Sequence, residues 1–208
     1  MNWLPFFALV LYGALHSLLA ARPLKNRIRN IIGERRFEGF YRLAYNVIAA
    51  LTFVPVALVM LLMPSRVLWE IPMPWAFGAM LLQVVGVVGL VAAVLQADPL
   101  RFAGIKQAIA YFNGDPLPLP PEPLQTSGFY GLVRHPLYFF SLLFLWPTPV
   151  MTDAYLSFAF GATLYFIVGS LLEERRLLRE FETYATYRQR VPWLLPWPRR
   201  RSAAPKQG

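Results

Sequence analysis

The sequence contains no cysteine and only two histidines. The lack of cysteine excludes disulfide frameworks, thiolate metal sites and a cysteine nucleophile, and two histidines are too few for a multi-histidine metal site. Charged residues are also scarce, at 15% of the 208 residues against about 25% in an ordinary soluble domain. We therefore expect no metal site, and any thiol in a reaction of this protein must belong to its substrate.

The sequence is instead rich in apolar residues, which make up 57% of it and give a mean hydropathy of +0.44. A helix of about 20 residues is needed to cross a bilayer core of about 30 Å. Five apolar runs approach this length, at residues 3–21, 44–63, 75–95, 137–151 and 154–172. They predict an all-α integral membrane protein with about five transmembrane helices, in a single membrane domain, 1–208, whose N-terminal three-helix part is 1–95. Little sheet is expected, because no alternating strand pattern recurs.

The fourth run is short and is interrupted by Pro147 and Pro149. We expect this run to form a tight helical hairpin with the fifth, turning at Thr152 and Asp153. Asp153 is the expected N-cap of the last helix.

The net charge of +9 is compatible with two kinds of partner, nucleic acid or anionic lipid. If the N-terminus lies outside, every lysine and arginine except Arg66 falls on one face of the membrane, which the positive-inside rule makes cytoplasmic. This distribution favours a multi-pass protein of the bacterial inner membrane, with the C-terminus in the cytoplasm, over a nucleic-acid binder. The basic cluster follows the first apolar run, so we expect a retained helix there and not a signal peptide.

Polar residues gather in two segments on the cytoplasmic side, and ionisable groups at the ends of membrane spans are candidates for a functional site. In the first segment, 122–138, Arg134 and His135 directly precede Pro136, which suits the first turn of the fourth helix. The positive end of a helix favours an anion such as a carboxylate or phosphate. The first segment therefore predicts an anion site.

The second segment begins with Glu173 and Glu174 at the end of the last apolar run. Leu177, Phe181 and Tyr184 recur at helical spacing, which predicts an amphipathic cytoplasmic continuation of the helix. Two carboxylates at the negative end of a helix are unfavourable unless positive groups compensate them. Two interpretations stay open: a solvated ion-pair cluster with the arginines that follow, or a site for a cation or a hydroxyl-rich ligand.

The order and spacing of these residues resemble a known family. The motif Thr126-Ser-Gly-x-Tyr130-x3-Arg134-His135-Pro136-x-Tyr138 precedes Glu173-Glu174-x2-Leu177-x3-Phe181-x2-Tyr184-x2-Tyr187-x3-Val191-Pro192. This pattern is similar to the C-terminal half of the integral-membrane methyltransferases typified by isoprenylcysteine carboxyl methyltransferase, and phospholipid N-methyltransferases share much of it. The resemblance implies a helix bundle in which the 96–208 part binds S-adenosylmethionine at the cytoplasmic end. No glycine-rich element of soluble nucleotide-binding folds is present.

The resemblance also implies site residues. Those expected to bind the cofactor are Glu122, Pro123, Leu124, Gln125, Tyr130, His135, Pro136, Leu137, Tyr138 and Glu173. The tyrosines would contact adenine or the sulfonium, His135 would donate to the carboxylate or ribose, and Glu173 would accept from the ribose or the ammonium. Arg134 and Glu174 are the expected catalytic residues, with Glu174 or His135 as the base for an ammonium acceptor. The alternatives are a helix-capping histidine and an interfacial belt of tyrosines.

One position departs from the family pattern. In the eukaryotic carboxyl methyltransferase an arginine one helical turn before the glutamate pair is tied to the substrate carboxylate, and this chain has Gly169 there. A prenylcysteine substrate is therefore disfavoured, while carboxylate, amine and thiol acceptors in general stay open.

His16 stands out in the N-terminal half, because a histidine inside an apolar helix is costly unless it is hydrogen-bonded or used. The stretches His16-Ser17, Arg22-Pro-Leu-Lys25 and Tyr41-Arg42-Leu-Ala-Tyr45-Asn46 resemble the front half of membrane proteins related to zeta-carotene isomerase and methanethiol methyltransferase. His16 has three open roles: a structural hydrogen bond to Ser17, Asn46 or a backbone carbonyl, a substrate-side role, or haem ligation. An acceptor entering from lipid would pass four polar groups: His16, Tyr45, Asn46 and Tyr165.

These observations predict an enzyme that transfers a methyl group from S-adenosylmethionine to a lipid-soluble or small membrane-partitioning acceptor. Its expected partners are the bilayer and a lipid-derived or small hydrophobic substrate, and the sequence does not indicate an oligomer. The alternative is a haem-dependent isomerase or redox-linked membrane protein that uses His16 as axial ligand. A non-enzymatic membrane protein is disfavoured, because Tyr130, Arg134, His135 and Glu173 are all present in order.

Overall fold

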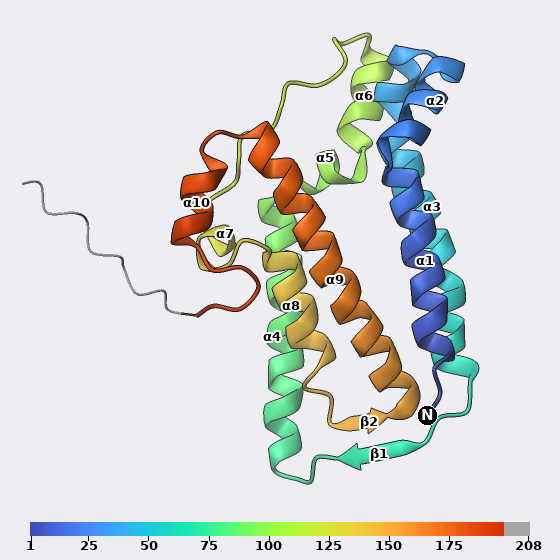
Figure 1. Ribbon diagram of the computed structural model, residues 1–208, viewed down its shortest axis with the longest axis vertical. Coiled ribbons are helices and arrows are strands. Elements are labelled where there is room, and N and C mark those ends of the chain that lie inside the picture. The colour runs from blue at the N-terminus through green and yellow to red at the C-terminus, as the bar shows by residue number, and fades with distance from the viewer. Residues whose placement is uncertain (198–208) are drawn as a thin grey trace, which may run out of the picture.

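The computed structural model describes residues 1–197 and consists mainly of helices (Figure 1). The helices are α1 (Leu4–Ala20), α2 (Arg22–Ile32), α3 (Glu34–Leu62), α4 (Trp75–Gln96), α5 (Pro99–Ala103), α6 (Ile105–Asn113), α7 (Phe129–Leu132), α8 (Pro136–Leu145), α9 (Asp153–Glu180) and α10 (Tyr184–Arg190). The strands β1 (Val67–Glu70) and β2 (Val150–Thr152) pair antiparallel. The predicted helical membrane architecture is confirmed. Four basic residues of the predicted cytoplasmic C-terminus lie outside the described residues: Arg199, Arg200, Arg201 and Lys206.

Three helices, α3, α4 and α9, are long and apolar enough to cross a membrane, and α1 with α2, bent by 54°, would make a fourth crossing. The predicted fourth span, 137–151, contains only the 10-residue helix α8. At about 1.5 Å per residue, α8 covers about 15 Å, which is half of a bilayer core. Pro147 and Pro149 account for its early end, because neither has an N–H to continue the helix. The described part therefore supports three or four full crossings and one half-length helix.

Four helices, α1, α3, α4 and α8, form two pairs with α9 between them (Figure 1). Helix α1 packs on α3, and α4 packs on α8. Helix α9 starts at the small sheet and runs obliquely along α1. Helices α8 and α9 therefore form a hairpin in the path of the chain, as predicted, but each packs mainly on another helix.

Two glycines explain why α8 packs so closely on α4. Gly86 and Gly89, on one face of α4, meet Phe140 and Phe144 of α8. A Cβ atom at Gly86 would lie 2.7 Å from the backbone nitrogen of Phe144. Small residues at a helix interface let membrane helices approach closely, and van der Waals packing then holds them together.

The two ends of the bundle differ. At one end, near the N-terminus and the sheet, the Asp153 carboxylate accepts hydrogen bonds from the backbone N–H groups of Asn2 and Arg66, each at 2.9 Å. The prediction that Asp153 is the N-cap of α9 is wrong, because Thr152 occupies that position and accepts from the N–H of Tyr155. The other end carries α2, α5, α6, α7 and α10 (Figure 1).

The substitution Gly86→Leu is expected to force α4 and α8 apart, because its side chain would have no space. Overpacking of this kind costs about 1–3 kcal/mol, so the midpoint of thermal unfolding in detergent should fall. Gly78→Leu is the matched control, since position 78 of the same helix meets no atom within 4 Å. Equal melting temperatures for the two variants would contradict this helix contact.

Candidate active site

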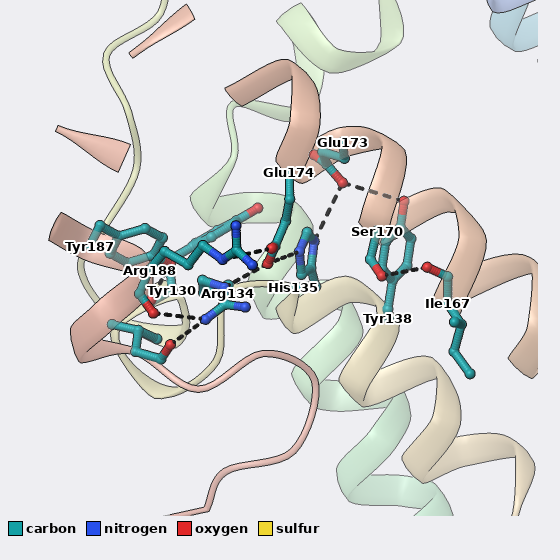
Figure 2. A network of polar contacts seen from close by, with 11 residues as sticks. Tyr130, Arg134, His135, Tyr138, Ile167, Ser170, Glu173, Glu174, Tyr187 and Arg188 are labelled. Carbon is teal, nitrogen blue, oxygen red and sulfur yellow. Dashed lines mark hydrogen bonds and ion pairs between the residues drawn. The ribbon is translucent and has the colours of Figure 1, made fainter. Parts of the chain in front are cut away.

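Arg134 and His135 lie in the short link between α7 and α8, and both are buried. Pro136 occupies the first position of α8, where a missing N–H costs nothing, so the helix starts directly after His135. Both side chains thereby face Glu174 of α9, although Arg134 and Glu174 are 40 residues apart in sequence (Figure 2). The two predicted polar segments therefore meet in space.

Arg134 holds the C-terminal segment against the start of α8 (Figure 2). Its Nε donates to Glu174 Oε1 at 2.7 Å. Its Nη1 and backbone N–H bond to four carbonyl oxygens of the C-terminal segment: those of Arg188, Val191, Pro192 and Trp193. The predicted continuation of the last helix is interrupted here, since α9 ends at Glu180 and α10 begins at Tyr184. The break lets the C-terminal segment turn toward Arg134.

Glu174 is the centre of this charge network. Its Oε1 accepts from Arg134 and lies 3.3 Å from His135 Nε2, while its Oε2 lies 3.3 Å from Arg188 Nε. The side chains of Arg134 and Glu174 are only 4% and 6% exposed. Removing one member of such a pair leaves the other charge buried and uncompensated, which is costly. The pair therefore stabilises the joint between α8, α9 and the C-terminal segment.

Glu173, the neighbouring carboxylate, has a different environment (Figure 2). Its Oε2 lies 3.4 Å from His135 Nδ1 and accepts a 3.5 Å hydrogen bond from the Tyr138 hydroxyl. The Tyr138 ring stacks between those of His135 and Phe166, at interplanar angles of 13° and 17°. The Glu173 side chain is 37% exposed, so its carboxylate is accessible to a ligand whereas that of Glu174 is not.

A cavity of about 470 Å³, which we call the first cavity, opens beside Glu173. It lies between α9, α10 and the proline-rich connector, residues 114–128, that joins α6 to α7. Seven of the predicted site residues line it: Glu122, Pro123, Leu124, Gln125, Tyr130, Arg134 and Glu173. Five others do not line it: His135, Pro136, Leu137, Tyr138 and Glu174. The structure thus brings both halves of the motif together and separates residues that face the cavity from residues that support its wall.

Sequence reasoning missed three residues that line the first cavity, Gln96, Asp98 and Arg101, and named three others only as part of the motif: Phe181, Tyr184 and Tyr187. Arg101 on α5 pairs its Nε with Glu122 at 2.5 Å and so ties the connector to α5. The pair Asp98-Pro99 could have revealed this helix, because Asp98 accepts from the Arg101 N–H as an N-cap. The Lys106 ammonium, hydrogen-bonded to Asp98, holds the pKa of that carboxyl below its usual value.

Tyr184 brings an unused hydrogen-bonding group to the first cavity. It is 1% exposed, and its hydroxyl has no hydrogen-bond partner among residues 1–197. Burial raises the pKa of Tyr184 to about 12, so the hydroxyl keeps its proton and is a donor. The Tyr187 hydroxyl, by contrast, donates to the carbonyl of Tyr130 at 2.6 Å. Because buried polar groups are normally hydrogen-bonded, the Tyr184 hydroxyl is available to donate a hydrogen bond to an acceptor atom of a ligand.

A second cavity, of about 680 Å³, lies on the other side of this region and is lined from α1, α2, α3, α5, α6, α8 and α9. Three of the predicted substrate-side residues line it: His16, Tyr45 and Asn46. Tyr165 is not among its lining residues, but its ring lies 6.4 Å from that of His16. The structure thus groups all four residues.

His16 bonds to a residue that was not predicted as its partner. Its Nε2 lies 2.5 Å from the Tyr45 hydroxyl, whereas Ser17, Asn46 or a carbonyl was expected. Asn46 instead donates to backbone carbonyls, including that of Arg42. His16 Nδ1 has no hydrogen-bond partner in the described part of the chain.

The two cavities approach each other at Tyr138 and Glu173. Tyr138 lines the second cavity, Glu173 lines the first, and the hydrogen bond between them crosses the boundary. Arg101 lines both. Gly169 faces the same place, since a Cβ there would lie 3.5 Å from the Tyr138 hydroxyl. A group passing from one cavity to the other would cross at this pair.

Several known proteins that are similar to this chain are named as methyltransferases. A methanethiol S-methyltransferase of Pseudomonas sp. (strain GM41(2012)) is 30% identical over 194 residues, which are 90% of this chain and 70% of that protein. Methanethiol S-methyltransferase 2 of Bradyrhizobium diazoefficiens is 40% identical over 106 residues, which are 50% of this chain and only 40% of that protein. A methanethiol S-methyltransferase of Mycobacterium tuberculosis is 33% identical over 140 residues, 66% of this chain and 56% of that protein.

The match of a family profile to the N-terminal two thirds of the chain shows its family. The profile described as NnrU protein matches residues 6–148. The chain therefore belongs to the NnrU protein family, and its relatives place it in the group of membrane methyltransferases that resemble isoprenylcysteine carboxyl methyltransferase. No solved structure matches the chain significantly.

The substitution Glu174→Gln preserves the shape of the side chain and removes the charge that faces Arg134. An arginine left buried without its carboxylate costs about 3–5 kcal/mol, so we expect a large fall in thermal stability in detergent and faster proteolysis after residue 184. Glu180→Gln is the control, because the exposed pair of Glu180 with Arg176 contributes about 0–1 kcal/mol. If both variants melt together, the buried pair does not stabilise the joint.

Proposed function

We propose that this protein transfers a methyl group from S-adenosylmethionine to a small thiol at the membrane. The observation that carries the proposal is that two cavities meet at the Tyr138–Glu173 hydrogen bond. The first cavity is lined by residues that were expected to bind the cofactor, among them Glu122 to Gln125. The relatives are named methanethiol S-methyltransferases, which supports a thiol acceptor. This chain has no cysteine, so the thiol belongs to the substrate.

The first cavity fits S-adenosylmethionine in size and in chemistry. Its volume of about 470 Å³ falls in the range of about 300–1,000 Å³ that is typical of small-molecule sites. Glu173 and Asp98 offer acceptors for ribose hydroxyls or an ammonium, and the Tyr184 hydroxyl lacks an acceptor. Tyr130 and Tyr187 offer ring faces for adenine or a cation. When bound, this cofactor supplies a methyl group on a positively charged sulfur.

The residues of the chain would orient the reactants and exclude water. Tyr138, stacked between two rings, and Glu173 would hold the boundary at which the methyl group passes, and orientation of this kind supplies much of the acceleration. Arg134 and Glu174 were predicted as catalytic residues. Because they are engaged with each other and with the C-terminal segment, we assign them a positioning role, in which they hold His135 and the cavity wall.

The acceptor would be activated in the second cavity. A thiol reacts as its thiolate, so its proton must leave as the new carbon–sulfur bond forms. His16 Nδ1 has no partner and would take this proton, with Nε2–H donating to Tyr45. The haem-dependent alternative also needs His16, and the contact of Nε2 with Tyr45 gives it no separate support.

Purified protein given methanethiol and S-adenosylmethionine should form dimethyl sulfide, which headspace gas chromatography measures. Glu173→Gln should weaken the binding of S-adenosylhomocysteine at least about tenfold, because a hydrogen bond to a charged group contributes about 1.5–3 kcal/mol. Glu180→Gln, which removes an exposed carboxylate from the same helix, is the control and should bind as wild type does. A wild-type protein that binds no S-adenosylhomocysteine by calorimetry would refute the proposal.

We also propose that the N-terminus is outside and the C-terminus is in the cytoplasm, in a bacterial inner membrane. Every described lysine and arginine except Arg66 lies on α2, α5, α6 or α10, on the adjoining ends of α3 and α9, or in the link before α8. Because the chain has no cysteine, single-cysteine variants report orientation directly. In intact cells an impermeant maleimide should label Glu70→Cys but reach Glu182→Cys only after permeabilisation. The reverse pattern would overturn this orientation.

A further inference from the structure

The second cavity is strongly basic. Five cationic side chains line it: Lys25, Arg29, Arg42, Arg101 and Arg176. Glu38 is the only carboxylate among its lining residues. A cavity lined by positive charges concentrates anions, because its low-dielectric walls focus the electric field.

Part of this positive charge is left without a carboxylate partner. Arg29 pairs with Glu38 at 2.9 Å, and Arg101 pairs with Glu122. Lys25 lies over the Tyr41 ring, and Arg42 donates to a backbone carbonyl. Within residues 1–197, no ion pair joins Lys25 or Arg42 to an acidic group. Arg176, the fifth cation, pairs with Glu180 at 3.6 Å, so Lys25 and Arg42 are the side chains available to an anion.

The buried side-chain amide of Gln107 adds a second requirement that a ligand of this cavity must meet. Gln107 is 8% exposed, lines the cavity, and donates from Nε2 to the carbonyl of Arg101 at 3.2 Å. This bond fixes the amide, and its Oε1 has no hydrogen-bond partner among the described residues. A buried acceptor left unpaired is costly, so a ligand that carries a hydrogen-bond donor as well as an anion would satisfy the site.

The size of the second cavity allows this ligand to bind in addition to the thiol acceptor. The volume of about 680 Å³ suits a drug-sized molecule, whereas a small thiol would leave most of it empty. Aromatic and aliphatic groups complete the lining, among them Phe37, Tyr41 and Leu119. The cavity lies at the end of the spans that carries the basic residues, which is where anionic head groups gather.

We propose that the second cavity binds a phosphate ester that also carries a hydroxyl, with Lys25 and Arg42 on the phosphate and Gln107 Oε1 accepting from the hydroxyl. The phosphate ester is either the head group of an anionic lipid or a soluble molecule with the same chemistry. Tyr138 lines this cavity and bonds to Glu173 in the first, so the ligand sits beside the proposed methyl-transfer site. The assignment goes beyond the proposed function and holds for any methyl acceptor.

The experiment uses the full chain, purified in detergent and freed of bound lipid. Calorimetry measures its affinity for a soluble short-chain phosphatidylglycerol, for glycerol phosphate and for a short-chain phosphatidylcholine, whose head group has no hydroxyl. We expect phosphatidylglycerol to bind at least tenfold more tightly than phosphatidylcholine. The double variant Lys25→Gln/Arg42→Gln should lose at least tenfold in this affinity. Arg175→Gln, an exposed arginine outside both cavities, is the matched control and should lose nothing.

The outcomes separate the sources of the ligand. Equal binding of glycerol phosphate and phosphatidylglycerol indicates a soluble ligand, and binding of phosphatidylglycerol alone indicates a lipid. Gln107→Leu should reduce the preference over phosphatidylcholine, and it carries the test if the double variant does not fold. Phosphatidylglycerol binding that is unchanged in both variants overturns the proposal.

Binding of S-adenosylhomocysteine, measured on the same samples, reports the first cavity independently. It should be retained in Lys25→Gln/Arg42→Gln. Charge-dependent phosphatidylglycerol binding without any S-adenosylhomocysteine binding would refute the proposed methyl transfer and leave this site standing.

Discussion

The buried ion pair of Arg134 and Glu174 is the interaction on which the candidate site depends. It joins the start of α8 to the cytoplasmic end proposed for α9 and to the C-terminal segment, both of which are at least 40 residues away in sequence. Successive helical residues point about 100° apart, so while Glu174 faces the buried arginine, Glu173 faces the first cavity. Two adjacent glutamates thereby serve different purposes: one stabilises the joint, and the other is accessible to a ligand.

The unequal lengths of α8 and α9 bring this pair together. Helix α8 stops after 10 residues, before Pro147, and the chain reaches the far end of the bundle through β2. Helix α9 then returns over its 28 residues, so that Glu173 lies about 30 Å along the helix from its start. That length matches a bilayer core. The site therefore lies one membrane thickness away from the sheet, beside the basic elements of the bundle.

Much of the lining of the first cavity could be anticipated from the family resemblance of the sequence. Glu122 to Gln125, Tyr130 and Glu173 were expected to face a cofactor, and they line one cavity. The contribution of Arg101 and Tyr184 could not be predicted, because it depends on α5 and α10 folding against the connector and not on any spacing in the chain. The hydrogen bond of His16 to Tyr45 was missed for the same reason, since it joins two helices whose relative rotation the sequence does not specify.

The sequence by itself determined the apolar helices, the distribution of basic residues and the motif that marks the family, because hydropathy, charge and spacing are local properties. It also predicted the N-cap of α9 one residue too late, since Asp153 looks like a cap but bonds to Asn2 and Arg66 from distant parts of the chain. Only the tertiary structure decided which glutamate is buried, which tyrosine is left unpaired and how two cavities meet at Tyr138. These features arise from packing between helices, where burial decides whether a charged or polar group is paired within the protein or left for a ligand.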